Sequence, residues 1–170
     1  LLKLIELKTI ELFKIYTTSF KSKFKYSKYL TEISAIDAAI ESVLINYVLR
    51  QYLVPARIDM NLDYTFEFHN EIKKGSVFIG EWNESNWNCS IRDVNEDGKL
   101  YLIKTDGIIT TTTEIGKVDY KNGTISIEGY SFSKVTKQLP VECTPVLDNL
   151  NVVRRHLFRL NKLSINVEES

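Results

Sequence analysis

The chain has 170 residues, of which 44% are hydrophobic and 26% are charged, so its composition is that of a globular protein and excludes a disordered or fibrous one. Its 22 basic and 22 acidic residues cancel, which argues against a nucleic-acid partner and against attraction to an anionic membrane. Charged residues also interrupt the apolar stretches before any reaches the ~20 residues of a membrane span. The length fits one domain, or one domain with an appendage.

Residues 1–20 favour an amphipathic helix, because they contain good helix formers and neither glycine nor proline. Their apolar residues recur on one broad stripe, which we call the helix stripe: Leu2, Ile5, Leu12, Phe13, Tyr16 and Phe20. Two packing partners are possible for this stripe: the chain's own domain, or a bundle with another chain. A seam this short does not form a stable coiled coil alone. We predict that the helix stripe is a protein–protein interface.

A turn and a shorter helix are expected next, the helix over Tyr26–Ile33, so that residues 1–36 form a helical segment. Ile40–Leu53 is rich in β-branched residues and is predicted to be a long strand or an extended arm, with a helix as the alternative. Residues 37–62 are therefore expected to link the helical segment to the rest of the chain.

In the second part of the chain, apolar and polar residues alternate with a period of two. The alternation is clear in Tyr64–Phe68 and recurs in Leu100–Ile103 and Ile125–Glu128. Such a pattern indicates strands with one buried face. We therefore predict a mainly antiparallel β-rich domain over residues 63–170, and an α+β fold class for the whole chain.

Two short segments have the chemistry of hairpin turns. Gly98 follows Asp97, and Gly123 follows Asn122, in each case between two predicted strands. A type I turn that ends in a left-handed glycine has this pattern. We expect Gly98, Asn122 and Gly123 to be structural turn residues.

The C-terminal part gives weaker signals. Pro140 and Pro145 bracket a short apolar segment, which predicts an edge strand because proline cannot donate to a central ladder. Val153–Leu160 favours a helical turn, and the alternation in Leu163–Val167 favours a last strand.

The two cysteines, Cys89 and Cys143, each lie in phase with apolar neighbours. Two cysteines are too few for a disulfide scaffold, and their spacing is not that of a zinc site. We expect buried free thiols in a reducing compartment, with a single bridge between them as the alternative.

The sequence contains no HExxH, CxxC, calcium-loop or glycine-rich phosphate-loop motif. His69 falls on the polar side of its strand and is expected at the surface, although a Cys89–His69 nucleophile pair is the alternative. The basic cluster of Arg154, Arg155, His156 and Arg159 is expected to be solvated or to contact a partner. We predict no enzymatic activity, no metal, no cofactor and no small-molecule substrate.

Trp82 and Trp87 form the one feature that suggests a ligand. Asparagines 83, 86 and 88 surround them, and aromatic faces beside amide groups are typical of sugar-binding sites. A carbohydrate-binding β module is therefore the alternative function. The simpler interpretation is that the indoles cover the sheet or contact a protein neighbour.

Several motifs, taken in order, resemble the C-terminal region of the J-like baseplate wedge proteins of T-even-like contractile-tailed bacteriophages. The resemblance covers roughly residues 20–168, and it rests on the order and spacing of five motifs. They are Phe24–Leu30, Ile33–Ile40, Tyr64–Ile72, Asp97–Ile103 and Ile115–Ile127. One departure is that Leu44–Leu53 contains only Arg50, where the family has an arginine-rich strand.

The resemblance implies a structural role in a virus tail. It implies a protein that pairs with a second copy of itself and with other wedge proteins, and that joins neighbouring wedges around the tail hub. The expected location is the virion baseplate, after assembly in the host cytoplasm. The chain begins at Leu1 and its one methionine is Met60, so we expect it to be the C-terminal part of a longer protein.

Overall fold

The computed structural model describes residues 2–18, 23–24, 26–36, 40–56, 60–146, 150–151 and 157–167. The chain divides into two compact units. We call Leu1–Val48 together with Leu147–Ser170 the helical unit, and Leu49–Val146 the barrel unit. Each is described by itself.

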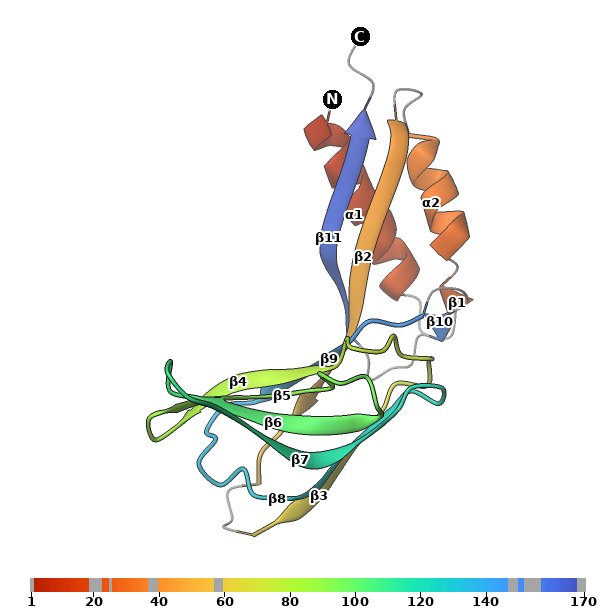
Figure 1. Cartoon of the computed structure of the whole chain (residues 1–170). Helices are drawn as coiled ribbons and strands as arrows, with labels where there is room; N and C mark the ends of the chain where they lie inside the picture. The colour runs from red at the N-terminus through yellow and green to blue at the C-terminus, as the bar shows by residue number, and fades with distance from the viewer. Residues whose placement is uncertain are drawn as a thin grey trace. The chain divides into compact units, whose positions relative to one another are not determined.

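The helical unit combines two helices with parts of the chain that are far apart in sequence (Figure 1). Its elements are α1 (Leu2–Thr18), β1 (Lys23–Phe24), α2 (Tyr26–Ser34), most of β2 (Ile40–Leu53), β10 (Leu150–Asn151) and β11 (Leu157–Val167). β1 pairs with β10 in antiparallel register, and β11 is hydrogen-bonded to β2.

Buried side chains hold the two helices together. Ile5 of α1 and Tyr29 and Ile33 of α2 are fully buried. The Tyr29 hydroxyl donates a hydrogen bond of 2.8 Å to the carbonyl oxygen of Thr9. Thr9 in turn donates to the carbonyl of Ile5, as a threonine inside a helix commonly does. The buried hydroxyl groups of Thr9 and Tyr29 are therefore satisfied within the unit.

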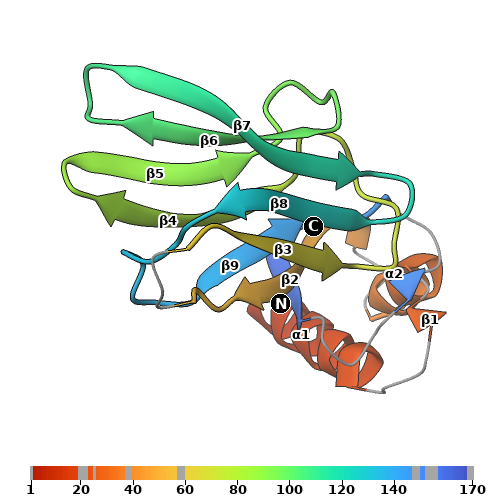
Figure 2. The same ribbon diagram turned by 90° about the horizontal axis from the view of Figure 1, so that it is seen from below.

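The barrel unit is an antiparallel sheet that curls until it is nearly barrel-shaped (Figure 2). The strand order is β2-β9-β4-β5-β6-β7-β8-β3. The strands are the end of β2, β3 (Leu62–Glu67), β4 (Phe78–Glu84), β5 (Trp87–Arg92), β6 (Lys99–Thr105), β7 (Thr110–Asp119), β8 (Thr124–Tyr130) and β9 (Leu139–Cys143). Where the first and last strands meet, Gln51 Nε2 of β2 donates to the carbonyl of Glu67 of β3 at 2.8 Å. A side chain thus bridges the seam.

The alternation in the sequence places one face of each strand in the barrel core. Phe66, Leu100, Leu102, Ile125 and Ile127 are all at most 7% exposed. The next residues along each strand are half-buried or exposed. This confirms the predicted α+β fold with a β-rich part, because the period of two is the period of the pleat.

The two predicted turns close hairpins as expected. Gly98 has a φ of +81° between β5 and β6, and Gly123 has a φ of +69° between β7 and β8. The Asp119 carboxylate accepts hydrogen bonds from the amide and the side chain of Asn122, which fixes the second turn. A Cβ atom on Gly123 would lie 2.0 Å from the carbonyl oxygen of Asn70, so this position requires glycine for space as well as for φ.

The predicted segment Ile40–Leu53 is a strand, β2, but the predicted division into residues 1–36, 37–62 and 63–170 differs from the structure. The barrel unit begins at Leu49 because the end of β2 pairs with β9. Residues from 147 onward belong to the helical unit because β10 and β11 pair with β1 and β2. Long-range pairing decides both boundaries.

Two predictions for the C-terminal part are wrong. β9 is an inner strand between β2 and β4, whereas its prolines predicted an edge strand. Pro140 is tolerated because the ladder between β4 and β9 ends at the Ile79–Val141 pair, so its missing N–H falls outside that ladder. Leu157–Leu160 begin β11 and are not a helical turn; residues 152–156 lie outside the described residues.

Candidate functional site

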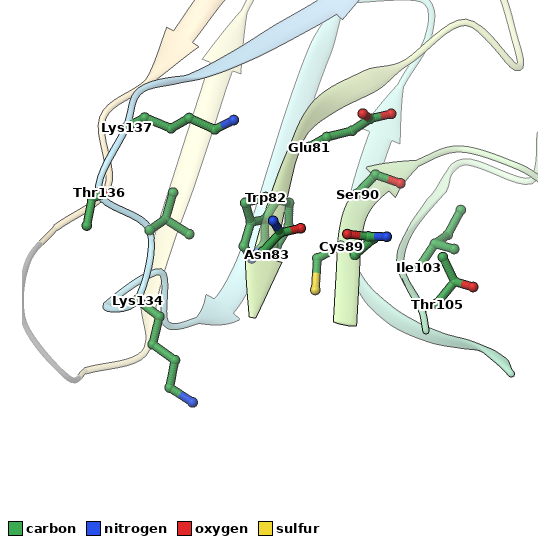
Figure 3. A pocket seen from close by; sticks show the side chains of 12 residues that line it. Glu81, Trp82, Asn83, Cys89, Ser90, Ile103, Thr105, Lys134, Thr136 and Lys137 are labelled. Carbon is green, nitrogen blue, oxygen red and sulfur yellow. The ribbon is translucent and has the colours of Figure 1, made fainter. Parts of the chain in front are cut away.

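A pocket of about 690 Å³ opens on the barrel unit beside the β4–β5 hairpin (Figure 3). Three strands and the segment 134–137 line it. Its lining includes Trp82 and Asn83 of β4, Asn88 and Cys89 of β5, Lys134 and Lys137. The lining combines amide, ammonium, carboxylate, thiol and apolar groups, and such a mixture suits a small polar molecule.

Trp82 forms a wall of this pocket from within an aromatic cluster. Its side chain is only 5% exposed, and its ring packs edge to face against Phe132 at 5.6 Å and Tyr130 at 6.5 Å between centroids. Phe132 also packs edge to face on Tyr64 at 5.3 Å. Trp87 is half-buried and is not part of the pocket lining. The structure therefore does not bring the two indoles together as a stacking platform.

A carboxylate and two lysines hold the pocket segment against the sheet. Glu84 accepts a hydrogen bond from Lys104 at 2.8 Å and one from Lys134 at 3.4 Å. The hydrogen bond from Lys104 lowers the pKa of the Glu84 carboxyl, and burial opposes it. Burial raises the pKa of Tyr130, and the negative charge of Glu84 adds to this effect. The group acts as an anchor for the segment that contains Lys134.

Asp93 is a buried carboxylate whose role is structural. It is 1% exposed and accepts hydrogen bonds from the amide of Val77 at 2.9 Å, the amide of Gly75 at 2.8 Å and the hydroxyl of Tyr120 at 3.1 Å. Burial raises the pKa of Asp93, and these hydrogen bonds oppose the rise. Burial and the neighbouring Asp93 raise the pKa of Tyr120 to about 12. The carboxylate joins the segment before β4 to the β7–β8 hairpin.

Both cysteines are buried free thiols, as the sequence predicted. Burial raises the pKa of the Cys89 and Cys143 thiols, which disfavours a nucleophilic thiolate. His69 lies two residues after the end of β3, where it is exposed, and its Nε2 is 3.6 Å from Oε2 of Glu67, the last residue of that strand. The predicted surface position is confirmed, although His69 is not part of the strand. Among the described residues, no group of three or more His, Cys, Asp or Glu side chains could hold a metal ion.

The helix stripe is only partly described. Ile5 is fully buried within the helical unit, and Leu12 is half-buried. The side chains of Leu2, Phe13 and Tyr16, and the whole of Phe20, lie outside the described residues. Arg154, Arg155 and His156 also lie outside them, and so does the side chain of Arg159. The interface role of the stripe stays a prediction.

Sequence reasoning missed two exposed apolar features. Leu7 and Ile10 of α1 are 56% and 38% exposed, on the side of the helix away from Ile5. Ile108 and Ile109, between β6 and β7, are 93% and 55% exposed. The pair on α1 could have been found from the 100° step between successive helix residues, which places Leu7 and Ile10 away from Ile5. The second pair could have been found because two apolar residues stand in a turn.

Comparison of the chain with models of known protein families, with curated proteins and with solved structures found no match. In the part of the chain that the structure describes, no helix is long and apolar enough to cross a membrane.

Proposed function

We propose that this chain is a non-catalytic assembly domain of a contractile-tail baseplate wedge, which pairs with a second copy of itself and with other wedge proteins in the virion. The ordered motifs that resemble the J-like wedge proteins support this proposal. Among the described residues, the buried carboxylate and thiols are already occupied with structural contacts or packing, which supports a role without chemistry.

The observation that carries the proposal is the pair Leu7 and Ile10 on α1. Their neighbours on the helix, Lys3 and Lys14, are exposed as well, while Ile5 is covered by the chain itself. α1 therefore presents two exposed apolar side chains, set among charged residues, on the side away from Ile5. Covering these two side chains would stabilise an assembly by roughly 25 cal/mol per Å² of apolar area removed from water.

The first test is the state of association of the purified chain. Multi-angle light scattering over a range of concentrations should show a dimer or a larger species. The double substitution Leu7→Ser and Ile10→Ser should shift association to higher concentration by about tenfold or more, because the loss of each buried side chain costs about 1–2 kcal/mol. Glu6→Ser, at another exposed position of α1, is the matched control and should have no effect.

The second test concerns the particle. Cross-linking followed by mass spectrometry on purified tails should place α1 next to a second copy or another wedge protein. A chain that stays monomeric at every concentration, and that is absent from purified baseplates, would contradict the proposal.

A second candidate is carbohydrate binding, and the pocket beside β4 favours it. Asn83, Asn88 and Ser90 supply the amide and hydroxyl groups that bind sugar hydroxyls. Titration with neutral oligosaccharides should then show binding that Asn83→Ala and Asn88→Ala abolish, with Trp87→Phe, outside the lining, as the control. Silence on a glycan array would remove this candidate.

A further inference from the structure

The first half of β7 has no strand paired with its outer side (Figure 2). β6 pairs with β7 over residues 110–117, whereas β8 pairs with it only over residues 116–119. β8 leaves the ladder where Gly129, at a φ of +58°, donates its amide to the Asp63 carboxylate at 2.7 Å. Among the described residues of the barrel unit, residues 110–115 therefore form an open sheet edge.

This edge lacks the usual features that keep strands from pairing. Residues 110–114 are exposed on both faces of the strand. Soluble proteins commonly protect an open edge with lysine, proline or a very short strand. Residues 110–115 contain neither lysine nor proline, and the irregularity in their pairing with β6 comes only at their end, at Ile115. Threonine also has a high β propensity. The edge is therefore suited to accept another strand.

The backbone groups that point outward from this edge belong to alternate residues. The amide of Asp106 donates to the carbonyl of Ile109 at 3.3 Å, so these two residues form a hydrogen-bonded pair at the start of the hairpin ladder. Hydrogen-bonded and non-hydrogen-bonded pairs alternate along an antiparallel ladder. The N–H and C=O groups of Thr110, Thr112 and Glu114 therefore point away from β6, towards the open side.

The sequence of the edge is nearly the same in both directions. Ile109–Ile115 reads Ile-Thr-Thr-Thr-Thr-Glu-Ile, with Thr112 at its centre. Antiparallel pairing of two copies about Thr112 brings the outward-pointing residues opposite each other, with about six backbone hydrogen bonds. It sets Glu114 opposite an uncharged threonine, and it brings Ile109, which is 55% exposed, beside the half-buried Ile115 of the other copy. This near-palindrome favours a second copy over an unrelated strand.

We propose that β7 of one copy pairs in antiparallel register with β7 of a second copy, about a twofold axis at Thr112. The inference rests on the proposed function, because only a protein that assembles brings two copies together. The pairing is isologous, so a single contact satisfies both edges and closes a dimer. It involves the barrel unit, so it adds to the contact proposed for α1 and does not replace it.

An extended strand of another protein is the competing occupant. An edge reserved for a different partner would still need a feature that prevents self-pairing, because each copy offers the same edge to every other copy. A charge at the centre of the run would be such a feature. Thr110–Thr113 carry no charge, so the edge has no protection against its own copy.

Two substitutions at the axis test the pairing. Thr112→Lys and Thr112→Glu each place two like charges opposite each other, and each should weaken association in light scattering by about tenfold or more. An equimolar mixture of the two should restore association, because opposite charges then face each other. Thr112 is exposed, so the unfolding midpoint should not change. Thr136→Lys, at an exposed position outside β7, is the matched control and should have no effect.

Thr112→Cys gives a direct readout of the same contact. Residues in a hydrogen-bonded antiparallel pair have Cα atoms about 5.5 Å apart, a separation that a disulfide spans. Mild oxidation should therefore convert the Thr112→Cys chain into a covalent dimer, while Cys89 and Cys143 are buried and do not contribute. Thr136→Cys is the matched control and should give only background dimer under the same conditions.

Two results would overturn the pairing. In the first, oxidation of the Thr112→Cys chain gives no more covalent dimer than oxidation of the Thr136→Cys chain. In the second, the mixture of Thr112→Lys and Thr112→Glu associates no better than either variant alone. The second result is the one expected if the edge accepts a strand of another protein.

The same variants separate this inference from the proposed function. If the unmodified chain associates and both Thr112→Lys and Thr112→Glu associate equally well, the β7 pairing is wrong and the assembly function stands. If the unmodified chain stays monomeric at every concentration and Thr112→Cys gives no covalent dimer, both are wrong.

Discussion

Arg50 of β2 and Glu142 of β9 lie directly opposite each other in the barrel ladder, and their side chains form an ion pair. The guanidinium donates to the carboxylate through Nε at 2.6 Å and also through Nη2. The two side chains are only 19% and 17% exposed. The pair therefore joins two strands that are far apart in the sequence at a poorly solvated position.

Removing one partner of this pair should destabilise the chain more than removing both. Glu142→Leu leaves the Arg50 charge without its carboxylate and should lower the free energy of unfolding by about 1–3 kcal/mol. The double substitution Arg50→Leu and Glu142→Leu should recover most of this loss. Urea unfolding measures all three. The exposed pair Lys117–Glu128 is the control: Glu128→Leu should change stability by less than about 0.5 kcal/mol.

Two glycines with positive φ should respond differently to alanine. Gly107→Ala meets open space, so only the strained φ acts, and the loss should be about 1 kcal/mol. Gly123→Ala adds a clash with the carbonyl oxygen of Asn70 and should cost about 3 kcal/mol or prevent folding. Thermal unfolding followed by circular dichroism checks the order. Equal effects at both positions would contradict the predicted contact between the β7–β8 turn and Asn70.

Stability should depend on pH through Glu84. Hydrogen bonds from its lysines hold the pKa of its carboxyl below the ordinary value of 4.5, so the native state favours the ionised form. Its contribution, about 1 kcal/mol, is present above the unfolded pKa and is lost as the pH falls through the folded pKa. The difference in unfolding free energy between the unmodified chain and Glu84→Gln should therefore shrink on acidification. Glu81→Gln, at a surface position 4.0 Å from Arg92, is the matched control substitution.

The thiols should be unreactive in the native state. Cys89 and Cys143 are at most 1% exposed, and burial raises the pKa of both, so a disulfide reagent such as DTNB should find no accessible thiolate. In denaturant, both of the chain's cysteines should react. A native chain that reacts at the rate of free cysteine would contradict the burial, and an unreactive denatured chain would indicate a bridge.

Much of the barrel could be predicted because its signals are local. The alternation around Phe66 and Phe68 reports a pleated strand with one buried face, and it needs no knowledge of the strand's partner. Gly98 and Gly123 indicate positions where the backbone needs a positive φ, and this requirement is also local to the turn. The α+β class follows from such signals alone.

The candidate site could not be predicted in the same way. Trp82 and Trp87 are close in sequence, yet only Trp82 lines the pocket, and its indole packs against Phe132 and Tyr130 from a distant segment. Leu7 and Ile10 became candidate contacts only when the structure showed which side of α1 is covered by α2. Local pattern identifies apolar residues and does not say which of them find a partner.

By itself, the sequence determined the alternating barrel strands, the two glycine turns and the burial of the cysteines, since these follow from side-chain period, backbone φ and hydrophobicity; the structure shows that the two thiols are not bridged. Only the tertiary structure decided that β9 lies between β2 and β4, where Arg50 meets Glu142, and that β11 joins the helical unit. The physical reason is that strand order and burial depend on which segments with compatible faces pack together. That choice is made by the free energy of the whole fold and not by any segment alone.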